Sequence, residues 1–372
     1  MNQRLFVMGN EAVAWGAVSA GCLHFFGYPI TPQNQIPEWF ARELPKRGGD
    51  YVQAQDETGA INMLFGAAAA GVRVMASTSG PGWSLMQEGM SNAVAAELPF
   101  VIVEVQRPGP GIGVGTRFYP QSQVDYKTIT KGGGHGGYNN IVLAPVSVQE
   151  ACDLTQLAFY LADKYRNPVI LLMDHLVGEM REPLEVRPLE FGPLPEKDWA
   201  VLGKTHHKDG KKRLATALRA IFDPPPLDSR LAWTRHFYDK YQTIAASEVR
   251  YESYKLEDAE LIVVAFGCMA RLSKQAAKAA RSKGLRVGLV RPTTLWPFPQ
   301  GVLKDNAKRG AKFLVVEANL GQMVDDVRLS VEGQADIRLL AEQNMSPTGD
   351  EWIMPERILQ EIEDYYMEGK VK

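Results

Sequence analysis

Three polar side chains of this sequence have the type and the setting for chemistry at a binding site. Thr31 lies in the run GYPITP at residues 27–32, where prolines on both sides restrict the backbone and hold the hydroxyl in a fixed direction. Glu57 begins a run of small residues, and Arg107 follows a buried, β-rich segment. A carboxylate can transfer protons, and a guanidinium can bind a carboxylate through two parallel hydrogen bonds.

Each of these residues also has a purely structural interpretation. Thr31 fits a turn or capping hydroxyl. Glu57 fits an acidic residue that stabilises a helix N-terminus, and Arg107 fits a surface ion pair. Residue type and spacing leave both interpretations open for all three.

The signatures of several enzyme classes do not occur in the sequence. There is no His-Glu-x-x-His and no Gly-x-Ser-x-Gly, and Gly203-Lys204-Thr205 lacks the earlier glycine of a phosphate loop. The glycines between residues 109 and 115 alternate strictly, as in a flexible loop. No histidine is spaced with cysteines or carboxylates as metal ligands are, so we expect no metal site in this chain.

Charge and composition exclude further classes. Lys and Arg number 41 against 43 Asp and Glu, and this net charge of −2 gives no basic footprint for nucleic acid or an anionic membrane. We find no signal-peptide core and no apolar run of the roughly 18–20 residues that span a membrane, and we expect a cytoplasmic protein. Cys22, Cys152 and Cys268 are too far apart to hold an iron–sulfur cluster, and we expect buried, reduced thiols.

Helix-period and β-rich segments alternate over residues 10–174. We expect strands at 23–26, 51–54, 73–77, 100–105, 141–144 and 168–173, and helices at 10–21, 33–44, 57–71, 82–95 and 148–164. Strands separated by helices predict right-handed crossovers and a doubly wound parallel sheet. Polar groups at strand ends are how such sheets bind ligands.

The pattern changes between residues 180 and 256, where the sequence is rich in proline and charge. We predict a connector there with at most short helices. Strands at 260–266, 286–290 and 313–317, with a helix at 270–283, then predict a smaller α/β domain. The predicted division is a first domain over 1–185, a connector over 186–256 and a second domain over 257–372.

Several motifs occur together in one order. They are YPITP at 28–32, ETGA at 57–60, TSGPG at 78–82, VQRPGP at 105–110, KGGGHG at 131–136, KYRNPVI at 164–170 and RPTTLWPFP at 291–299. This set resembles the α subunit of the thiamine-diphosphate-dependent 2-oxoacid:ferredoxin (acceptor) oxidoreductases. The resemblance covers most of the chain outside the connector, and the glycine-histidine run is most similar to the 2-oxoisovalerate type.

The resemblance implies a pyrimidine-binding thiamine-enzyme domain followed by a transketolase C-terminal-like domain. Glu57 matches the carboxylate that bonds the pyrimidine ring nitrogen and so activates the cofactor. Thr31 and Arg107 match the groups that hold the oxo and carboxylate oxygens of the substrate. By the same resemblance, Pro29, Ile30 and Gly80 are expected beside the cofactor.

The resemblance also implies partners. The sequence contains no Gly-Asp-Gly, the thiamine-enzyme motif for Mg²⁺ and diphosphate. We expect a β subunit to supply that motif and a [4Fe-4S] cluster. A γ subunit, a ferredoxin-like δ subunit with further clusters, and ferredoxin or another electron acceptor are expected as well. Coenzyme A is the expected co-substrate, and an acyl-CoA and CO₂ are the expected products.

Three residues are candidates for the substrate pocket. Trp83 is bulkier than expected after GPG, Arg117 lies in an inserted stretch at 114–119, and His135 lies in the glycine-histidine run. The added aromatic groups favour a branched or aryl 2-oxo acid, such as 2-oxoisovalerate or phenylglyoxylate. Arg117 could instead receive a second carboxylate, as 2-oxoglutarate requires, and pyruvate is a further alternative.

Two other functions are also compatible with these residues. One is a non-catalytic assembly subunit that keeps the thiamine-enzyme fold, and the other is a non-oxidative thiamine enzyme. The presence of Thr31, Glu57 and Arg107 together argues against the first. The colour of the native complex separates the second, because iron–sulfur clusters are brown.

Overall fold

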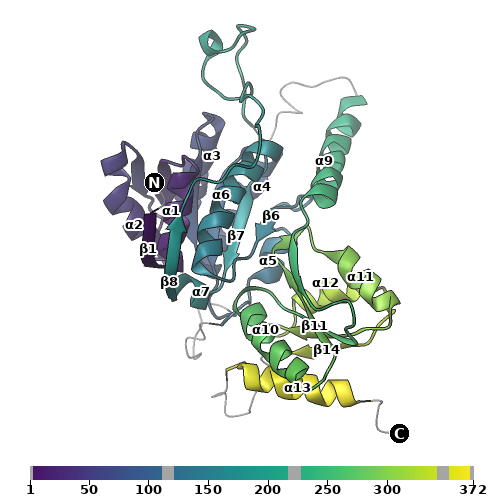
Figure 1. The fold of residues 1–372 in the computed structure, drawn as a ribbon. Helices are drawn as coiled ribbons and strands as arrows, with labels where there is room; N and C mark the ends of the chain where they lie inside the picture. Colours follow the sequence, from purple (N-terminus) through teal and green to yellow (C-terminus); the bar gives the residue numbers. More distant parts are fainter. Residues whose placement is uncertain (1–2, 111–120, 217–227, 342–351, 369–372) are drawn as a thin grey trace.

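A computed structural model describes residues 3–110, 121–216, 228–341 and 352–368 of the chain. Two α/β units follow one another, each built on its own sheet (Figure 1). The N-terminal strand lies in the first unit, and the C-terminal helix α13 (Pro355–Met367) packs against α10 (Gly267–Ser282) of the second.

The first unit contains a seven-stranded sheet in the order β12-β6-β7-β5-β4-β2-β3. Its strands are β2 (His24–Gly27), β3 (Asp50–Gln53), β4 (Val74–Thr78), β5 (Val101–Val105), β6 (Ile141–Leu143), β7 (Val169–Met173) and β12 (Thr294–Trp296). All neighbours pair in parallel except β12, which is antiparallel to β6. Every residue of β4, β5 and β7 is buried, as expected for central strands covered on both faces.

Helices cover this sheet from both sides, because the chain reverses its direction of travel across the sheet after β3. On one side, α1 (Gly9–Ser19) packs against α2 (Gln35–Glu43) and α6 (Val148–Tyr165). On the other, α3 (Glu57–Ala69) packs against α4 (Gly80–Ala95). The predicted doubly wound parallel sheet is therefore confirmed.

The second unit contains a five-stranded sheet in the order β14-β13-β10-β11-β9. Its strands are β9 (Tyr251–Tyr254), β10 (Leu261–Val264), β11 (Val287–Pro292), β13 (Lys312–Val316) and β14 (Ile337–Leu340). Only β9 runs antiparallel to its neighbour. Two further helices, α11 (Gln300–Lys308) and α12 (Met323–Val331), pack against each other, which completes the smaller α/β domain that the sequence predicts.

The predicted connector contains more regular structure than expected. The prediction of only short helices is wrong, because α9 (Asp228–Ser247) has 20 residues. Glu97, after α4, anchors this helix: its Oε1 accepts hydrogen bonds from His236 Nε2 at 2.8 Å and Lys240 Nζ at 3.2 Å. These contacts join residues about 140 positions apart, so no local pattern reveals them.

The sequence pattern also does not predict two of the strand pairings. β1 (Gln3–Met8) pairs antiparallel with β8 (Arg181–Val186) in a separate two-stranded sheet, and α7 (His175–Glu179) precedes β8. β12 crosses from the C-terminal part of the chain to the edge of the first sheet, where Thr294 aligns with Leu143. The boundaries proposed at 185 and 257 stay a prediction.

Side chains tie the two units together. Tyr126, at the start of the short helix α5 (Tyr126–Thr130), donates a hydrogen bond to Asp326 Oδ2 of α12 at 2.6 Å. Asp174, after β7, accepts a hydrogen bond from the backbone N–H of Cys268 at the start of α10 and another from Gln123 Nε2 at 3.0 Å. Because Tyr126 and Asp174 are buried, these contacts form the polar centre of the seam between the units.

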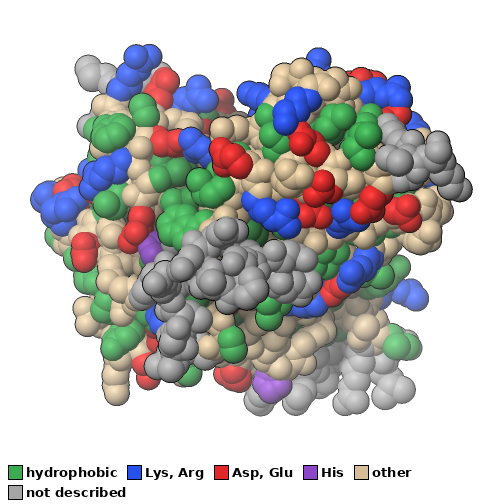
Figure 2. Space-filling model, turned by 90° about the horizontal axis from the view of Figure 1, so that it is seen from below, with side chains coloured by type: hydrophobic (Ala, Val, Ile, Leu, Met, Phe, Trp, Pro, Cys, Tyr) green, Lys and Arg blue, Asp and Glu red, His purple; other side chains and the backbone are tan. Residues whose placement is uncertain are grey.

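The remaining findings concern the surface and the cysteines. Figure 2 shows one face of the molecule, where basic and acidic side chains intermingle with hydrophobic ones between them. Over the described ranges, no helix combines the length and the apolar character that a membrane crossing requires. Cys22, Cys152 and Cys268 are buried free thiols, as predicted, and burial raises the pKa of Cys22 and of Cys152 to about 12.

Candidate functional site

Glu57 is the first residue of α3 and lies almost completely buried, with 4% of its surface exposed. Asp56 caps the same helix by accepting the Gly59 N–H at 2.7 Å, so Glu57 is not needed for that task. Burial raises the pKa of the Glu57 carboxyl, and the neighbouring Asp56 charge adds to the rise. A buried carboxyl with a raised pKa is suited to proton exchange at neutral pH.

Gly82, in the first turn of α4, lies directly against Glu57. A Cβ atom added at this glycine would fall 2.4 Å from Glu57 Oε1 and 2.2 Å from Thr78 Oγ1. Further along the two helices, a Cβ added at Gly89 would fall 2.6 Å from Ile61. The small residues of α3 and α4 therefore let the two helices approach closely within this chain, and one consequence is that the Glu57 carboxylate is enclosed.

Thr31 and Arg107 meet at the same edge of the sheet. Thr31 follows β2 and Arg107 follows β5, and both strands flank β4 in a parallel arrangement. Arg107 Nη1 donates a hydrogen bond to the Thr31 backbone oxygen at 3.3 Å. Thr31 and Pro29 are exposed and Ile30 is half-buried, so the proline-rich turn is open to a ligand.

A cavity of about 660 Å³ opens beside Arg107. Both units contribute to its wall, which consists of Gly80, Pro81, Ser84, Arg107, Pro108, Gly109, Pro110, Val124, Asp125, Leu320 and Gln322. Most of these residues are apolar or uncharged, and Arg107 is the only cationic side chain among the described residues of the lining. The cavity therefore suits a small anion with an apolar body.

Some of the predicted site residues lie together near the start of α4. Arg107 and Gly80 line the cavity, and Thr31 contacts Arg107. Glu57 lies against the α4 residue Gly82, two positions after Gly80. Thus the sequence-derived candidates for the substrate carboxylate and for the cofactor converge on the N-terminus of α4.

The pocket candidates lie elsewhere. Trp83 is buried in the core with 1% exposed and donates its indole N–H to the Thr128 oxygen at 3.3 Å, so it supports α4 from behind and does not line the cavity. His135 lies on the surface, 3.6 Å from Glu88 of α4, and is also absent from the described lining. Arg117 lies outside the described residues.

Asp125 is a site residue that the sequence analysis missed. Its carboxylate lines the cavity and lies next to the start of α4, where a Cβ added to Gly80 would be 3.3 Å from both of its oxygens. Burial raises the pKa of Asp125 to about 6. The sequence carried no signal for this role: no helix was predicted after Asp125, and an aspartate outside predicted elements is typical of a turn or a capping residue.

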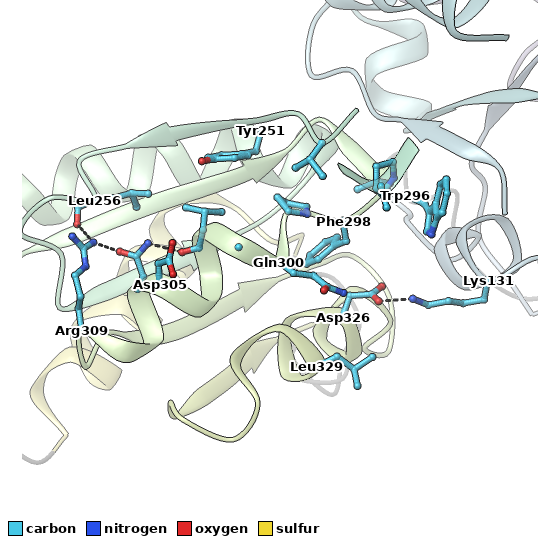
Figure 3. A pocket seen from close by; sticks show the side chains of 18 of the residues that line it. Lys131, Tyr251, Leu256, Trp296, Phe298, Gln300, Asp305, Arg309, Asp326 and Leu329 are labelled. Atoms are coloured by element: carbon cyan, nitrogen blue, oxygen red, sulfur yellow. Dashed lines mark hydrogen bonds and ion pairs between the residues drawn. The ribbon is translucent and has the colours of Figure 1, made fainter. Parts of the chain in front are cut away.

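A larger cavity of about 960 Å³ is lined mostly by the second unit, with Lys131 and β12 from the first, and contains none of the predicted site residues. Figure 3 shows its aromatic wall, formed by Tyr251, Trp296 and Phe298, with the Lys131–Asp326 ion pair at one end. Arg309, at the other end, binds the Leu256 oxygen. Because Lys131 is paired with Asp326, and Glu257 and Asp305 add negative charge to the described lining, the smaller cavity is the stronger candidate for an anionic substrate.

The described residues of this site do not form a metal-binding cluster. Among the described residues, no cluster of three or more His, Cys, Asp or Glu side chains is arranged to hold a metal ion. The residues present do fit the aromatic half of a cofactor, because the glycine at position 82 leaves space beside the Glu57 carboxylate that a Cβ would fill.

This fold and this site define a thiamine-enzyme subunit, and comparison with known proteins supports that class. Residues 15–218 match the family described as pyruvate flavodoxin/ferredoxin oxidoreductase, thiamine diphosphate-binding. Residues 259–352 match the pyruvate:ferredoxin oxidoreductase core domain II. The chain belongs to the 2-oxoacid:ferredoxin oxidoreductase family, as the sequence motifs predicted.

Two relatives illustrate the range within the family. The chain is 48% identical over 334 residues to the ketoisovalerate oxidoreductase subunit VorB of Methanothermobacter marburgensis, covering 90% of this chain and 91% of the relative. It is 40% identical over 341 residues to the 2-oxoglutarate synthase subunit KorA of Methanocaldococcus jannaschii, covering 87% and 90%.

Solved structures share the fold. The 2-oxoglutarate:ferredoxin oxidoreductase of Magnetococcus marinus, with 2-oxoglutarate, coenzyme A and succinyl-CoA bound, superposes with a TM-score of 0.84 at 27% identity. The match covers 98% of this chain and 65% of that one. A split-gene transketolase, described as an inactive β4 tetramer, matches with a TM-score of 0.58 at 12% identity and shows the fold alone.

Proposed function

We propose that this chain is the α subunit of an enzyme that oxidatively decarboxylates a branched-chain 2-oxo acid to its acyl-CoA and CO₂. The observation that carries the proposal is the cavity beside Arg107, with one described cation and an otherwise apolar or uncharged wall apart from Asp125. A 2-oxo acid with a hydrocarbon side chain presents one carboxylate and an apolar body. The 48% identity to a ketoisovalerate oxidoreductase subunit supports the same substrate class.

Arg107 and Thr31 are assigned to the substrate. The Arg107 guanidinium suits a carboxylate in charge and in geometry. The hydrogen bond from Arg107 Nη1 to the Thr31 oxygen holds the two residues at one strand-end edge. We assign the Thr31 hydroxyl to the substrate's oxo oxygen, because the proline-bracketed turn aims it in a fixed direction.

Glu57 is assigned to the pyrimidine ring of thiamine diphosphate, with Pro29, Ile30 and Gly80 beside it. When bound, this cofactor supplies the nucleophile for the substrate carbonyl and takes up the electron pair released by decarboxylation. The contribution of Glu57 is to hold or release a proton at the ring nitrogen, which its buried position and raised pKa favour. The close approach of α4 at Gly82 restricts water beside that carboxyl.

The remaining parts of the reaction are assigned to partners. The Gly-Asp-Gly motif for Mg²⁺ and diphosphate does not occur in these 372 residues. We therefore propose that a β subunit supplies it together with a [4Fe-4S] cluster. The proposed complex also contains γ and ferredoxin-like δ subunits and passes its electrons to ferredoxin or another acceptor.

A second candidate substrate is 2-oxoglutarate. The relatives named 2-oxoglutarate synthase subunits, at 38–40% identity, favour it. A second substrate carboxylate would need a second cation, and no other cation occurs among the described residues of the lining. Arg117, which lies outside the described residues, is the residue to test.

The experiment is a substrate panel with the native complex. The complex is assayed with 2-oxoisovalerate, phenylglyoxylate, 2-oxoglutarate and pyruvate, with and without coenzyme A, and with an artificial electron acceptor. We expect the highest kcat/KM for 2-oxoisovalerate and dependence on coenzyme A. A preference for 2-oxoglutarate that Arg117→Ala abolishes would establish the second candidate, and a complex inactive on all four acids would reject the proposal.

A further inference from the structure

Two carboxyl groups lie next to each other beneath the cavity. Glu104, in β5, is completely buried, and Asp125 comes from the segment before α5. The two carboxyl groups interact with each other, and Glu104 also interacts with the Gly80 N–H at the start of α4. Both Glu104 oxygens and Asp125 Oδ2 are buried, and none of them has a hydrogen-bond partner among the described residues.

Such a pair resists full ionisation near neutral pH. Two carboxylates have no hydrogen to share, and their charges repel strongly in a buried setting. Burial, with the Asp125 charge next in importance, raises the pKa of Glu104 well above its usual range, and burial also raises that of Asp125 to about 6. Because the groups interact, the protons belong to the pair and not to either residue alone.

Asp125 connects this pair to Arg107. Its carboxylate is close enough to Arg107 for the backbone N–H and the guanidinium to favour its charged form, and Asp125 lines the same cavity. Its own backbone N–H donates to Gln106 Oε1 at 3.2 Å. The segment that carries Arg107 is therefore held at residues 106 and 107 by residue 125.

Among the described residues, few charged groups face the pair. Arg107 follows β5, and Asp174 follows β7 and interacts with Glu104. Gln106 Nε2 lies 3.4 Å from Asp174 Oδ1 and links that carboxyl to the same network. From α4 comes the Gly80 N–H, and the segment before α12 adds only the uncharged Leu320 and Gln322 to the cavity.

We propose that Asp125 is a positioning residue for Arg107, and that Glu104 and Asp125 hold one shared proton, which keeps a single negative charge beneath the substrate's carboxylate. The role toward substrate rests on the proposed function of Arg107, whereas the shared proton does not. Loss of that proton at alkaline pH adds a second negative charge beside the anion site. The affinity for the substrate then falls, whereas Glu57, which is assigned to proton transfer, is unchanged.

The test uses the assembled complex and measures kcat and KM for its preferred 2-oxo acid across pH. The wild-type KM should rise at alkaline pH, and Glu104→Gln should remove that rise while leaving the KM at pH 7 within about threefold, because the amide still donates to Asp125. Asp125→Ala should raise the KM at least tenfold with a smaller change in kcat. Asp125→Asn should restore much of the loss, since its amide oxygen still presents a partial negative charge to the Arg107 N–H. Glu196→Gln, at an exposed glutamate of the connector, is the control.

A second measurement does not need turnover. The infrared spectrum at pH 7 should show a protonated-carboxyl C=O band that loses intensity in Glu104→Gln and not in Glu196→Gln. Unchanged infrared intensity together with an unaltered KM profile in Glu104→Gln would overturn the shared proton. An unchanged KM in Asp125→Ala would overturn the positioning role. If the wild-type complex turned over no 2-oxo acid, the proposed function would fail, and the infrared comparison would still decide whether the pair holds a proton.

Discussion

Gly82 and Glu57 are in such close contact that no side chain fits between them. A Cβ atom at residue 82 would lie 2.4 Å from Glu57 Oε1, well inside van der Waals contact. Because Gly82 lies in the first turn of α4 and Glu57 in the first turn of α3, the contact fixes how the two helix starts meet. The position of the carboxylate therefore depends on the absence of one methyl group.

Gly82→Ala should displace Glu57 and lower turnover at least tenfold. Overpacking of this kind also costs about 1–3 kcal/mol of unfolding free energy. Urea unfolding of the chain and turnover of the assembled complex measure the two effects. Gly301→Ala, in α11, is the matched control, because an added Cβ meets nothing within 4 Å there. Normal turnover in Gly82→Ala would contradict the role given to this contact.

Glu57→Gln should reduce turnover by about 10² or more, the contribution expected of a positioned acid or base. The fold should persist, and the melting temperature at neutral pH should stay equal or rise slightly, because burial disfavours the charged carboxyl that the amide replaces. Activity assays and thermal unfolding test this, with the exposed Glu38→Gln of α2 as the control. Wild-type turnover in the Glu57→Gln variant would remove Glu57 from the catalytic machinery.

Arg107→Lys should raise the KM for the 2-oxo acid by roughly tenfold to a hundredfold, with a smaller change in kcat. Lysine keeps the charge but loses the two-pronged geometry, and a hydrogen bond to a charged group is worth about 1.5–3 kcal/mol. Steady-state kinetics of the complex provide the measurement. Arg328→Lys, at an exposed arginine of α12, is the comparison. The prediction fails if the two variants show the same KM.

The seam between the two units should weaken as pH rises. Burial raises the pKa of Asp174 to about 7, from an ordinary value near 4 in the unfolded chain. The folded state thus binds more protons between about pH 4 and pH 7, and this contribution to stability is present at low pH and is lost as pH rises through 7. Each pKa unit corresponds to about 1.4 kcal/mol.

Urea unfolding at several pH values measures this dependence. Between pH 5 and pH 8 the unfolding free energy of Asp174→Asn should fall less steeply than that of the wild type, although its absolute value is lower because the amide cannot accept every hydrogen bond that Asp174 accepts. Asp305→Asn, an exposed position in α11, should keep the wild-type slope. Identical slopes in all three proteins would show that Asp174 does not titrate with unfolding.

Local sequence determined the elements and the chemistry of their ends. Three features depend on a few neighbouring residues: the mostly apolar strands β4, β5 and β7, the proline turn before Thr31, and the start of a helix at Glu57. Together with the shared motifs, they were enough to predict the doubly wound parallel sheet and to propose Thr31, Glu57 and Arg107 as site residues. Hydrophobic periodicity and turn-forming residues act between positions close in sequence, and therefore these features could be predicted from the sequence alone.

Only the tertiary structure decided which of these residues meet. The contacts of α9 with Glu97, the crossing of β12 to the first sheet, the burial of Trp83 and the placing of Asp125 beneath Arg107 all join positions that are distant in sequence or ambiguous in type. Tryptophan can fill a core or line a pocket, and an aspartate before a helix can cap it or serve a site. The sheet topology decides which role each residue has, because the crossover connections bring the ends of separate strands to one edge of the sheet.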